Sequence, residues 1–161
     1  MRDTVRQAGR VLVLREDGAA LLFEFKDPVD GRRFWITPGG GLDPDETHEQ
    51  GAIRELFEET GIRVEAGCMP EIGRRTLAIR YGTHRFTQAE RYFLLRVGGG
   101  CAVSTQGHLD YERTDLADWG WLTAEDIEAR QAAGERFGPE ALAPLIRRML
   151  EQGPPDRPLS L

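Results

Sequence analysis

The stretch GGLDPDETHEQGAIRELFEETGI, residues 40–62, is the most informative part of the sequence and decides the fold. Its glycine- and proline-rich start predicts a loop, and the residues that follow predict a helix over 47–60. Thr47 suits the N-cap position with Gln50 three residues later, as in a capping box, and Gly61 suits the position that ends a helix. The stretch therefore predicts a loop followed by a capped helix.

The predicted helix has two chemically different sides. At about 100° per residue, Glu55, Glu58 and Glu59 fall within an arc of roughly 100°. The opposite side is mostly apolar and consists of Ala52, Ile53, Leu56, Phe57 and Thr60. We therefore expect the apolar side to pack on a sheet and the three carboxylates to gather on the other side.

Three gathered carboxylates indicate a metal site if they line a cleft, whereas on a solvated helix face they would carry no special meaning. In a cleft, two carboxylates about 6 Å apart repel by roughly 3 kcal/mol at an effective dielectric constant near 20, and a divalent cation would turn that repulsion into attraction. Oxygen ligands without paired histidine or cysteine favour Mg²⁺ or Mn²⁺ over zinc. Arg54 can reach Glu58 along the helix, and Glu46 can bond back to Arg54 or to a helix N–H, so both would orient the cluster.

The spacing within this stretch resembles that of the Nudix box, the motif of the Nudix hydrolase superfamily. Gly40 is followed by five residues, Glu46, seven residues, Arg54-Glu55-Leu56, one residue, Glu58-Glu59, one residue and Gly61-Ile62. The resemblance implies an α/β fold, a Nudix-type α/β/α sandwich with a mixed, partly antiparallel sheet. It also implies Mg²⁺-dependent hydrolysis of the pyrophosphate linkage in a nucleoside diphosphate derivative, such as a nucleotide, a nucleotide sugar or a dinucleoside polyphosphate.

The same resemblance implies roles for individual residues. Glu55, Glu58 and Glu59 would bind the metal, with the Gly40 carbonyl as a further ligand, and Glu46 and Arg54 would support them structurally. Water would displace a phosphate in line, and its proton would pass to Glu55, to Glu59 or, as in some members of the family, to an acid from a later loop. Residues 108–118 offer four such acids, of which Glu112 is the first choice: Asp110, Glu112, Asp115 and Asp118.

Three arginines are candidates for binding the substrate, because guanidinium groups pair well with phosphate oxygens. Arg32 and Arg33 lie in the loop that precedes the box, and Arg75 lies on or beside a later predicted strand. Exposure to solvent is the simpler explanation for Arg75 and for the other arginines on or beside the later predicted strands. The partner that we expect is a small nucleotide-type substrate, and the sequence does not choose among the nucleotide derivatives.

The rest of the chain predicts a sheet with further helices. Residues 10–15 and 20–25 predict a hairpin with an Asp-Gly turn, and residues 38–41 are expected to interrupt all regular structure. Further strands are expected over 34–36, 62–66, 74–82, 86–97 and 119–122, and further helices over 124–132 and 139–151. One domain is expected over 1–152, followed by a proline-rich tail, 153–161, that is extended or disordered.

Composition excludes several classes of protein. The 161 residues are 40% hydrophobic and 30% charged, which predicts a packed core, and 27 acidic against 21 basic residues give a net charge of −6. A surface that is acidic overall argues against a nucleic-acid binder. No apolar run approaches the roughly 20 residues that span a bilayer, so no membrane contact is expected. Two cysteines argue against a disulfide framework, and we expect a cytoplasmic protein.

Two alternative functions remain open at this point. A catalytically silent Nudix-like module could bind a nucleotide and report to a partner, although the presence of all box glutamates favours an enzyme. Removal of the 5′ pyrophosphate from RNA is disfavoured by the acidic balance, although some arginines could form a local basic groove: Arg74, Arg75, Arg80 and Arg85. A homodimer is compatible with a domain of this size.

Overall fold

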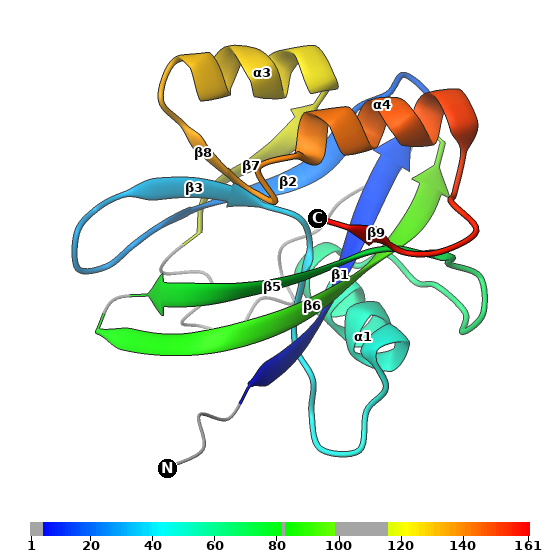
Figure 1. Ribbon diagram of the computed structural model, residues 1–161, viewed down its shortest axis with the longest axis horizontal. Helices are drawn as coiled ribbons and strands as arrows, with labels where there is room; N and C mark the ends of the chain where they lie inside the picture. Colours follow the sequence, from blue (N-terminus) through cyan, green and yellow to red (C-terminus); the bar gives the residue numbers. More distant parts are fainter. Residues whose placement is uncertain (1–4, 82, 99–115) are drawn as a thin grey trace.

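A computed structural model describes residues 5–81, 83–98 and 116–161 of the chain, which form one mixed sheet with helices on both faces (Figure 1). The strands are β1 (Arg6–Arg15), β2 (Ala20–Lys26), β3 (Arg33–Ile36), β4 (Gly39–Gly41), β5 (Glu71–Tyr81), β6 (His84–Val97), β7 (Leu116–Leu122), β8 (Arg136–Gly138) and β9 (Leu159–Ser160). The helices are α1 (His48–Thr60), α3 (Ala124–Ala132) and α4 (Leu142–Gln152).

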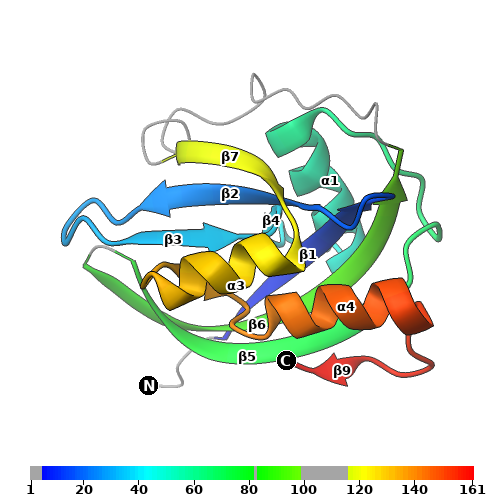
Figure 2. The ribbon, with the colours of Figure 1, turned by 90° about the horizontal axis from the view of Figure 1, so that it is seen from above.

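The side chains of β1 show how the two layers of core are built. Val11 and Val13 are fully buried in the cluster that includes Leu56 of α1. Leu12 and Leu14 point to the other face and lie in the cluster formed with α3 and α4. Because alternate residues of a strand face opposite sides, this pattern needs a helical layer on each face. The expected α/β/α sandwich is confirmed, with α1 on one side and α3 and α4 on the other (Figure 2).

The sheet splits next to β1, and this split creates room for a site. The strand order is β8-β3-β2-β1-β6-β5-β9, with β4 paired to β1 and β7 paired to β2. β1 runs parallel to β6 over its whole length, but it meets β2 only where Leu14 faces Ala20. Away from that point β2 and β3 diverge from β5 and β6, as Figure 2 shows.

Helix α1 has the predicted caps and, apart from Phe57, the predicted apolar side, since Ala52 and Leu56 are buried against the sheet. Thr47 and Gln50 form the capping box, and Gly61 ends the helix in the left-handed conformation with φ 76°. The expectation that Phe57 packs on the sheet is wrong, because its side chain is 43% exposed and the Arg63 guanidinium covers it at 4.5 Å. Glu59 is only 4% exposed, since the helix turns this carboxylate in toward Gly39.

Three other local predictions need correction. Residues 62–66 form no strand, because Ile62 and Val64 pack against the core on the way to β5 without a strand partner. Residues 39–41, expected to be irregular, form β4, since glycine backbone pairs antiparallel with β1. The helix expected from residue 139 begins at Leu142, as residues 136–138 form β8 beside β3.

The proline-rich tail ends on the sheet. Residues 159–160 form β9, which pairs parallel with β5, and Leu159 and Leu161 pack against the core. The tail is therefore extended rather than disordered at its end. No helix within the described ranges is long and apolar enough to cross a membrane.

Candidate active site

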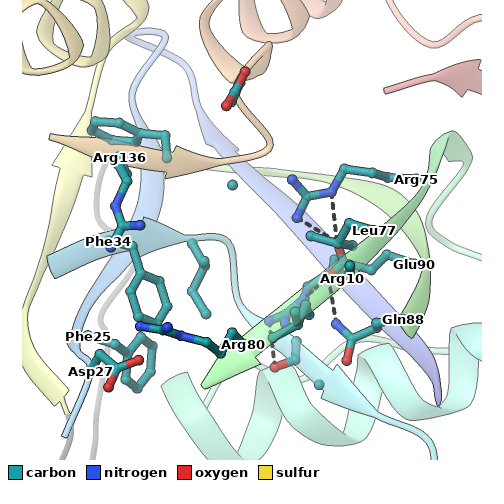
Figure 3. Close-up of a pocket in the computed structure, with 18 of the residues that line it drawn as sticks. Arg10, Phe25, Asp27, Phe34, Arg75, Leu77, Arg80, Gln88, Glu90 and Arg136 are labelled. Carbon is teal, nitrogen blue, oxygen red and sulfur yellow. Dashed lines mark hydrogen bonds and ion pairs between the residues drawn. The ribbon is translucent and has the colours of Figure 1, made fainter. Parts of the chain in front are cut away.

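A cavity of about 990 Å³ lies where the two parts of the sheet separate. One wall comes from β1, β5 and β6, and the other comes from β2, β3 and β8 (Figure 3). Glu55 and Glu59 of α1 line it together with Gly39 and Gly40 of β4. The cavity therefore joins two of the three box glutamates to a large space between the walls.

The glutamates of α1 differ in burial and in contacts. Glu59 is buried, and its Oε1 accepts a hydrogen bond of 2.8 Å from the Gly39 N–H. The Glu55 side chain is 12% exposed, and the Glu58 side chain is 33% exposed. A Cβ atom on Gly40 would lie 2.8 Å from the Glu55 carboxyl carbon, so only glycine allows the Glu55 carboxylate to approach the loop this closely.

Arg54 holds the acidic cluster together, as the sequence predicts. Its guanidinium donates to both Glu46 oxygens at 2.9 Å and to the Gly41 carbonyl at 3.0 Å. It also donates to Glu55 at 3.0 Å and to Glu58 at 3.3 Å. The hydrogen bonds from Arg54 hold the pKa of Glu46 below its usual value, and those to Glu46 raise the pKa of Arg54.

The donor atoms at this site suit a hard divalent cation in kind. They are carboxylate oxygens, the ligand type that Mg²⁺ prefers. Across the described residues, no group of three or more His, Cys, Asp or Glu side chains is arranged to hold a metal ion. Glu55 and Glu58 point to Arg54 instead. The glutamate side chains are therefore the right kind of ligand for a metal ion, but two of them, Glu55 and Glu58, are paired with Arg54.

The wall formed by β1, β5 and β6 is the floor of the cavity, and Glu90 forms the centre of a buried polar network on it. Its carboxylate accepts from Arg10 at 2.8 Å and from Arg75 at 2.7 and 2.9 Å. Gln88 and the Tyr92 hydroxyl donate to it at 3.1 Å each. Burial raises the pKa of Glu90, but the charges of Arg10 and Arg75 lower it by more, to about 2. Figure 3 shows the two guanidinium groups meeting Glu90.

Arg10 connects this network to the box. While its Nε pairs with Glu90, its Nη1 donates to the Gly39 carbonyl at 3.0 Å. The N–H of the same Gly39 donates to Glu59. Burial lowers the pKa of Arg10, and the attraction of Glu90 raises it by more, so the arginine stays charged. Hydrogen bonds to the carbonyl and from the N–H of Gly39 thus connect the Glu90 network and Glu59 through one residue.

Two of the three arginines predicted to bind the substrate line the cavity. Arg75 lines the cavity with its guanidinium paired to Glu90. Arg32 also lines it, 3.6 Å from Asp30. Arg33 pairs with Glu24 at 2.9 Å and is absent from the cavity lining. Glu112, the first choice for a general base from the later loop, lies outside the described residues.

Sequence reasoning missed Arg10 and Glu90 on the cavity floor. Arg10 and Glu90 are charged positions in strands that are otherwise rich in apolar residues, RVLVLR and ERYFLL. A buried charge is stable only when it is paired, so these two positions carried a signal of a polar network. Phe25 and Phe34 on the opposite wall, stacked with ring centroids 6.1 Å apart, carried no such signal.

Curated sequences and solved structures both resemble this chain. A MutT-like protein from Streptomyces ambofaciens is 43% identical over 121 residues, which cover 75% of this chain and 66% of the relative. An RNA pyrophosphohydrolase from Erythrobacter litoralis is 29% identical over 139 residues, 76% of this chain and 78% of the relative. Among solved structures, a MutT protein from Methanosarcina mazei aligns with a TM-score of 0.62 and 20% identity over 94% of this chain and 97% of its own.

The chain spans about half to two thirds of the length of several curated relatives that it matches. The model of the NUDIX domain family matches residues 4–143, which include the whole box, the cavity floor and the first strand. The spacing of the box, the sandwich and the family match agree with one another, and the chain belongs to the Nudix hydrolase superfamily.

Proposed function

We propose that the protein hydrolyses the pyrophosphate linkage of a nucleoside diphosphate derivative and that it needs Mg²⁺ or Mn²⁺ to do so. The observation that carries the proposal is the shared cavity, in which Glu55 and Glu59 lie next to a wall rich in arginine. Carboxylates bind divalent cations and guanidinium groups bind phosphates, and hydrolysis of a pyrophosphate uses both kinds of contact. The Nudix family match supports the same chemistry.

Residues of α1 would carry the reaction itself. Hydrolysis forms one bond from the water oxygen to phosphorus and breaks the bond from phosphorus to the bridging oxygen. We assign Glu55, Glu58 and Glu59 to the cation, and we assign the proton of the attacking water to Glu55 or Glu59 because both line the cavity. Bound Mg²⁺ would neutralise phosphate charge and lower the pKa of that water. Arg54 and Glu46 hold the carboxylates in place.

The opposite wall suits the organic part of a nucleotide. Phe25 and Phe34 stack at 6.1 Å and both line the cavity, so that they present aromatic surface to it. The faces of nucleobases stack well on such rings. We therefore place the phosphates at β4 and α1 and the nucleoside toward β2 and β3.

A panel of nucleotides tests the proposal directly. The purified protein is incubated with Mg²⁺ and nucleoside triphosphates, nucleotide sugars or dinucleoside polyphosphates, and phosphate is measured through a coupled phosphatase. We expect turnover of at least one class, and we expect Glu58→Gln to lose it while the protein stays folded. Glu125→Gln, on the exposed side of α3, is the matched control and should behave like the wild type. Full activity of Glu58→Gln would reject the metal assignment, and an inactive wild type would reject the function.

A second candidate substrate is the 5′ pyrophosphate of RNA. Similarity to the Erythrobacter RNA pyrophosphohydrolase favours it, and the cleaved bond is the same. A 5′-triphosphorylated oligonucleotide therefore belongs in the panel. Hydrolysis of the oligonucleotide with strong salt dependence, and none of mononucleotides, would select RNA.

A further inference from the structure

We propose that Arg6 binds a phosphate of the substrate beside the linkage that is cleaved and that Phe86 positions the Arg6 guanidinium for this contact. The proposal rests on the function above and adds a binding residue to it. Sequence reasoning pointed to Arg32, Arg33 and Arg75 instead.

Arg6 belongs to the floor of the cavity. It is the first residue of β1, and the parallel register places it opposite Gln88 of β6. Arg6, Phe86 and Gln88 all line the cavity. Because residues two apart on a strand share a face, Phe86, Gln88 and Glu90 form one row along the floor, with Arg6 beside its outer end.

Two contacts fix the direction of the Arg6 side chain. Its guanidinium carbon lies 5.5 Å from the centroid of the Phe86 ring, a cation–π distance. A Cβ atom on Gly41 would lie 2.6 Å from Nε and Nη2, so the guanidinium rests against the bare backbone of β4. Glycine at position 41 is therefore what lets Arg6 reach this place.

Among the described residues, no side chain neutralises the charge of Arg6. Its guanidinium forms no hydrogen bond or ion pair with any residue in the described ranges. Other arginines of the cavity differ, since Arg10 and Arg75 pair with Glu90 and Arg80 pairs with Asp30 at 2.9 Å. Arg6 keeps its planar set of N–H donors for a ligand, and phosphate oxygens match that set.

The position of Arg6 relative to the glutamates selects a phosphate as that ligand. Glu55 packs against Gly40, and Arg6 packs against Gly41. Gly40 and Gly41 are consecutive residues of β4, so the two side chains approach this strand from opposite faces, and both line the cavity. Arg136 also forms no ion pair with a described residue, but it lies on the opposite wall, near Phe34 (Figure 3). Of these two arginines, Arg6 is the one beside the proposed site of cleavage.

Steady-state kinetics of Arg6→Gln on the best substrate of the panel test the proposal. Loss of a charged hydrogen bond to phosphate should raise KM by about 10- to 100-fold and change kcat much less. The KM of Arg6→Lys should lie between those of the wild type and Arg6→Gln, because lysine keeps the charge but lacks the planar set of N–H donors. The matched control is Arg63→Gln, which removes an arginine that also covers a phenylalanine, outside the cavity, and should leave KM unchanged.

Phe86→Leu separates positioning from binding. It should raise KM less than Arg6→Gln does, and the double variant should equal Arg6→Gln alone, because Phe86 acts through Arg6. Circular dichroism confirms that each variant is folded. A wild-type KM for Arg6→Gln in an active enzyme would overturn the proposal and leave the function intact.

If no hydrolysis is found, a binding experiment tests the role of Arg6 separately from the proposed function. Calorimetric titration with inorganic pyrophosphate and Mg²⁺ should show binding to the wild type that Arg6→Gln weakens by a similar factor. Equal binding to both proteins, or no binding to the wild type, would overturn the assignment of Arg6.

Discussion

Replacing Glu90 by glutamine should destabilise the protein strongly at neutral pH and only weakly in acid. The Glu90 carboxylate accepts from Arg10, Arg75, Gln88 and Tyr92 on the floor of the cavity. Its pKa falls from an ordinary value of 4.5 to about 2 in the folded protein. A carboxylate whose pKa is lowered by this amount contributes about 3 kcal/mol to the free energy of unfolding at pH 7. Glutamine would leave two mostly buried guanidinium groups without their counter-charge, and the loss of this same interaction is typically about 3–5 kcal/mol.

The pH dependence gives this prediction its sign. Because the folded pKa is lowered, the stabilisation is complete above the unfolded value of 4.5 and disappears as the pH falls toward 2. Only about 1.4 kcal/mol of the titration effect remains at pH 3. The difference between wild type and Glu90→Gln should therefore shrink as the solution is acidified.

Urea unfolding at pH 7 and pH 3 measures both differences, and thermal unfolding at pH 7 should show a Tm lower by roughly 6–20 °C. The control is Glu128→Gln, which breaks the exposed pair with Arg147 and should leave stability unchanged at both pH values. A difference for Glu90→Gln below about 1 kcal/mol at pH 7, or one that is equal at pH 3, would refute the reasoning.

Three further predictions concern the box. Gly40→Ala should lower kcat by about 100-fold, since the new methyl would displace Glu55, whereas Gly98→Ala, with nothing within 4 Å, should keep wild-type kcat. Arg54→Lys should lower both kcat and Tm, because lysine cannot hold its partners with one planar fork; wild-type values for both would contradict the role of Arg54. Thr47→Ala should lower the stability by about 1 kcal/mol through loss of the cap, and Thr47→Ser should restore most of it in the same unfolding assay.

Local chemistry was readable from the sequence wherever one segment contains all the partners. Thr47, Gln50 and Gly61 lie within one helix and its ends, so their capping roles follow from spacing alone. Arg54 meets Glu46 and Glu58 within the same segment, and these contacts were predicted and are confirmed.

Features that depend on distant segments were not readable in this way. Glu90 meets Arg10 across 80 residues of sequence, and the pairing depends on the parallel register of β1 and β6. β4 forms because the backbone of three glycines pairs with β1, and the local propensity of these residues does not indicate a strand. Phe57 shows the same limit, since Arg63 covers a side chain that the helix pattern assigned to the core.

Binding of Mn²⁺ tests the central claim, that Glu55 and Glu59 hold a divalent cation against a phosphate in this cavity. Electron paramagnetic resonance would follow free Mn²⁺ during titration of the protein with a non-hydrolysable nucleotide analogue present. The wild type should bind Mn²⁺, and a Glu55→Gln, Glu59→Gln double variant that remains folded should bind it more than about tenfold less tightly. Equal Mn²⁺ affinity in the two proteins would contradict the account.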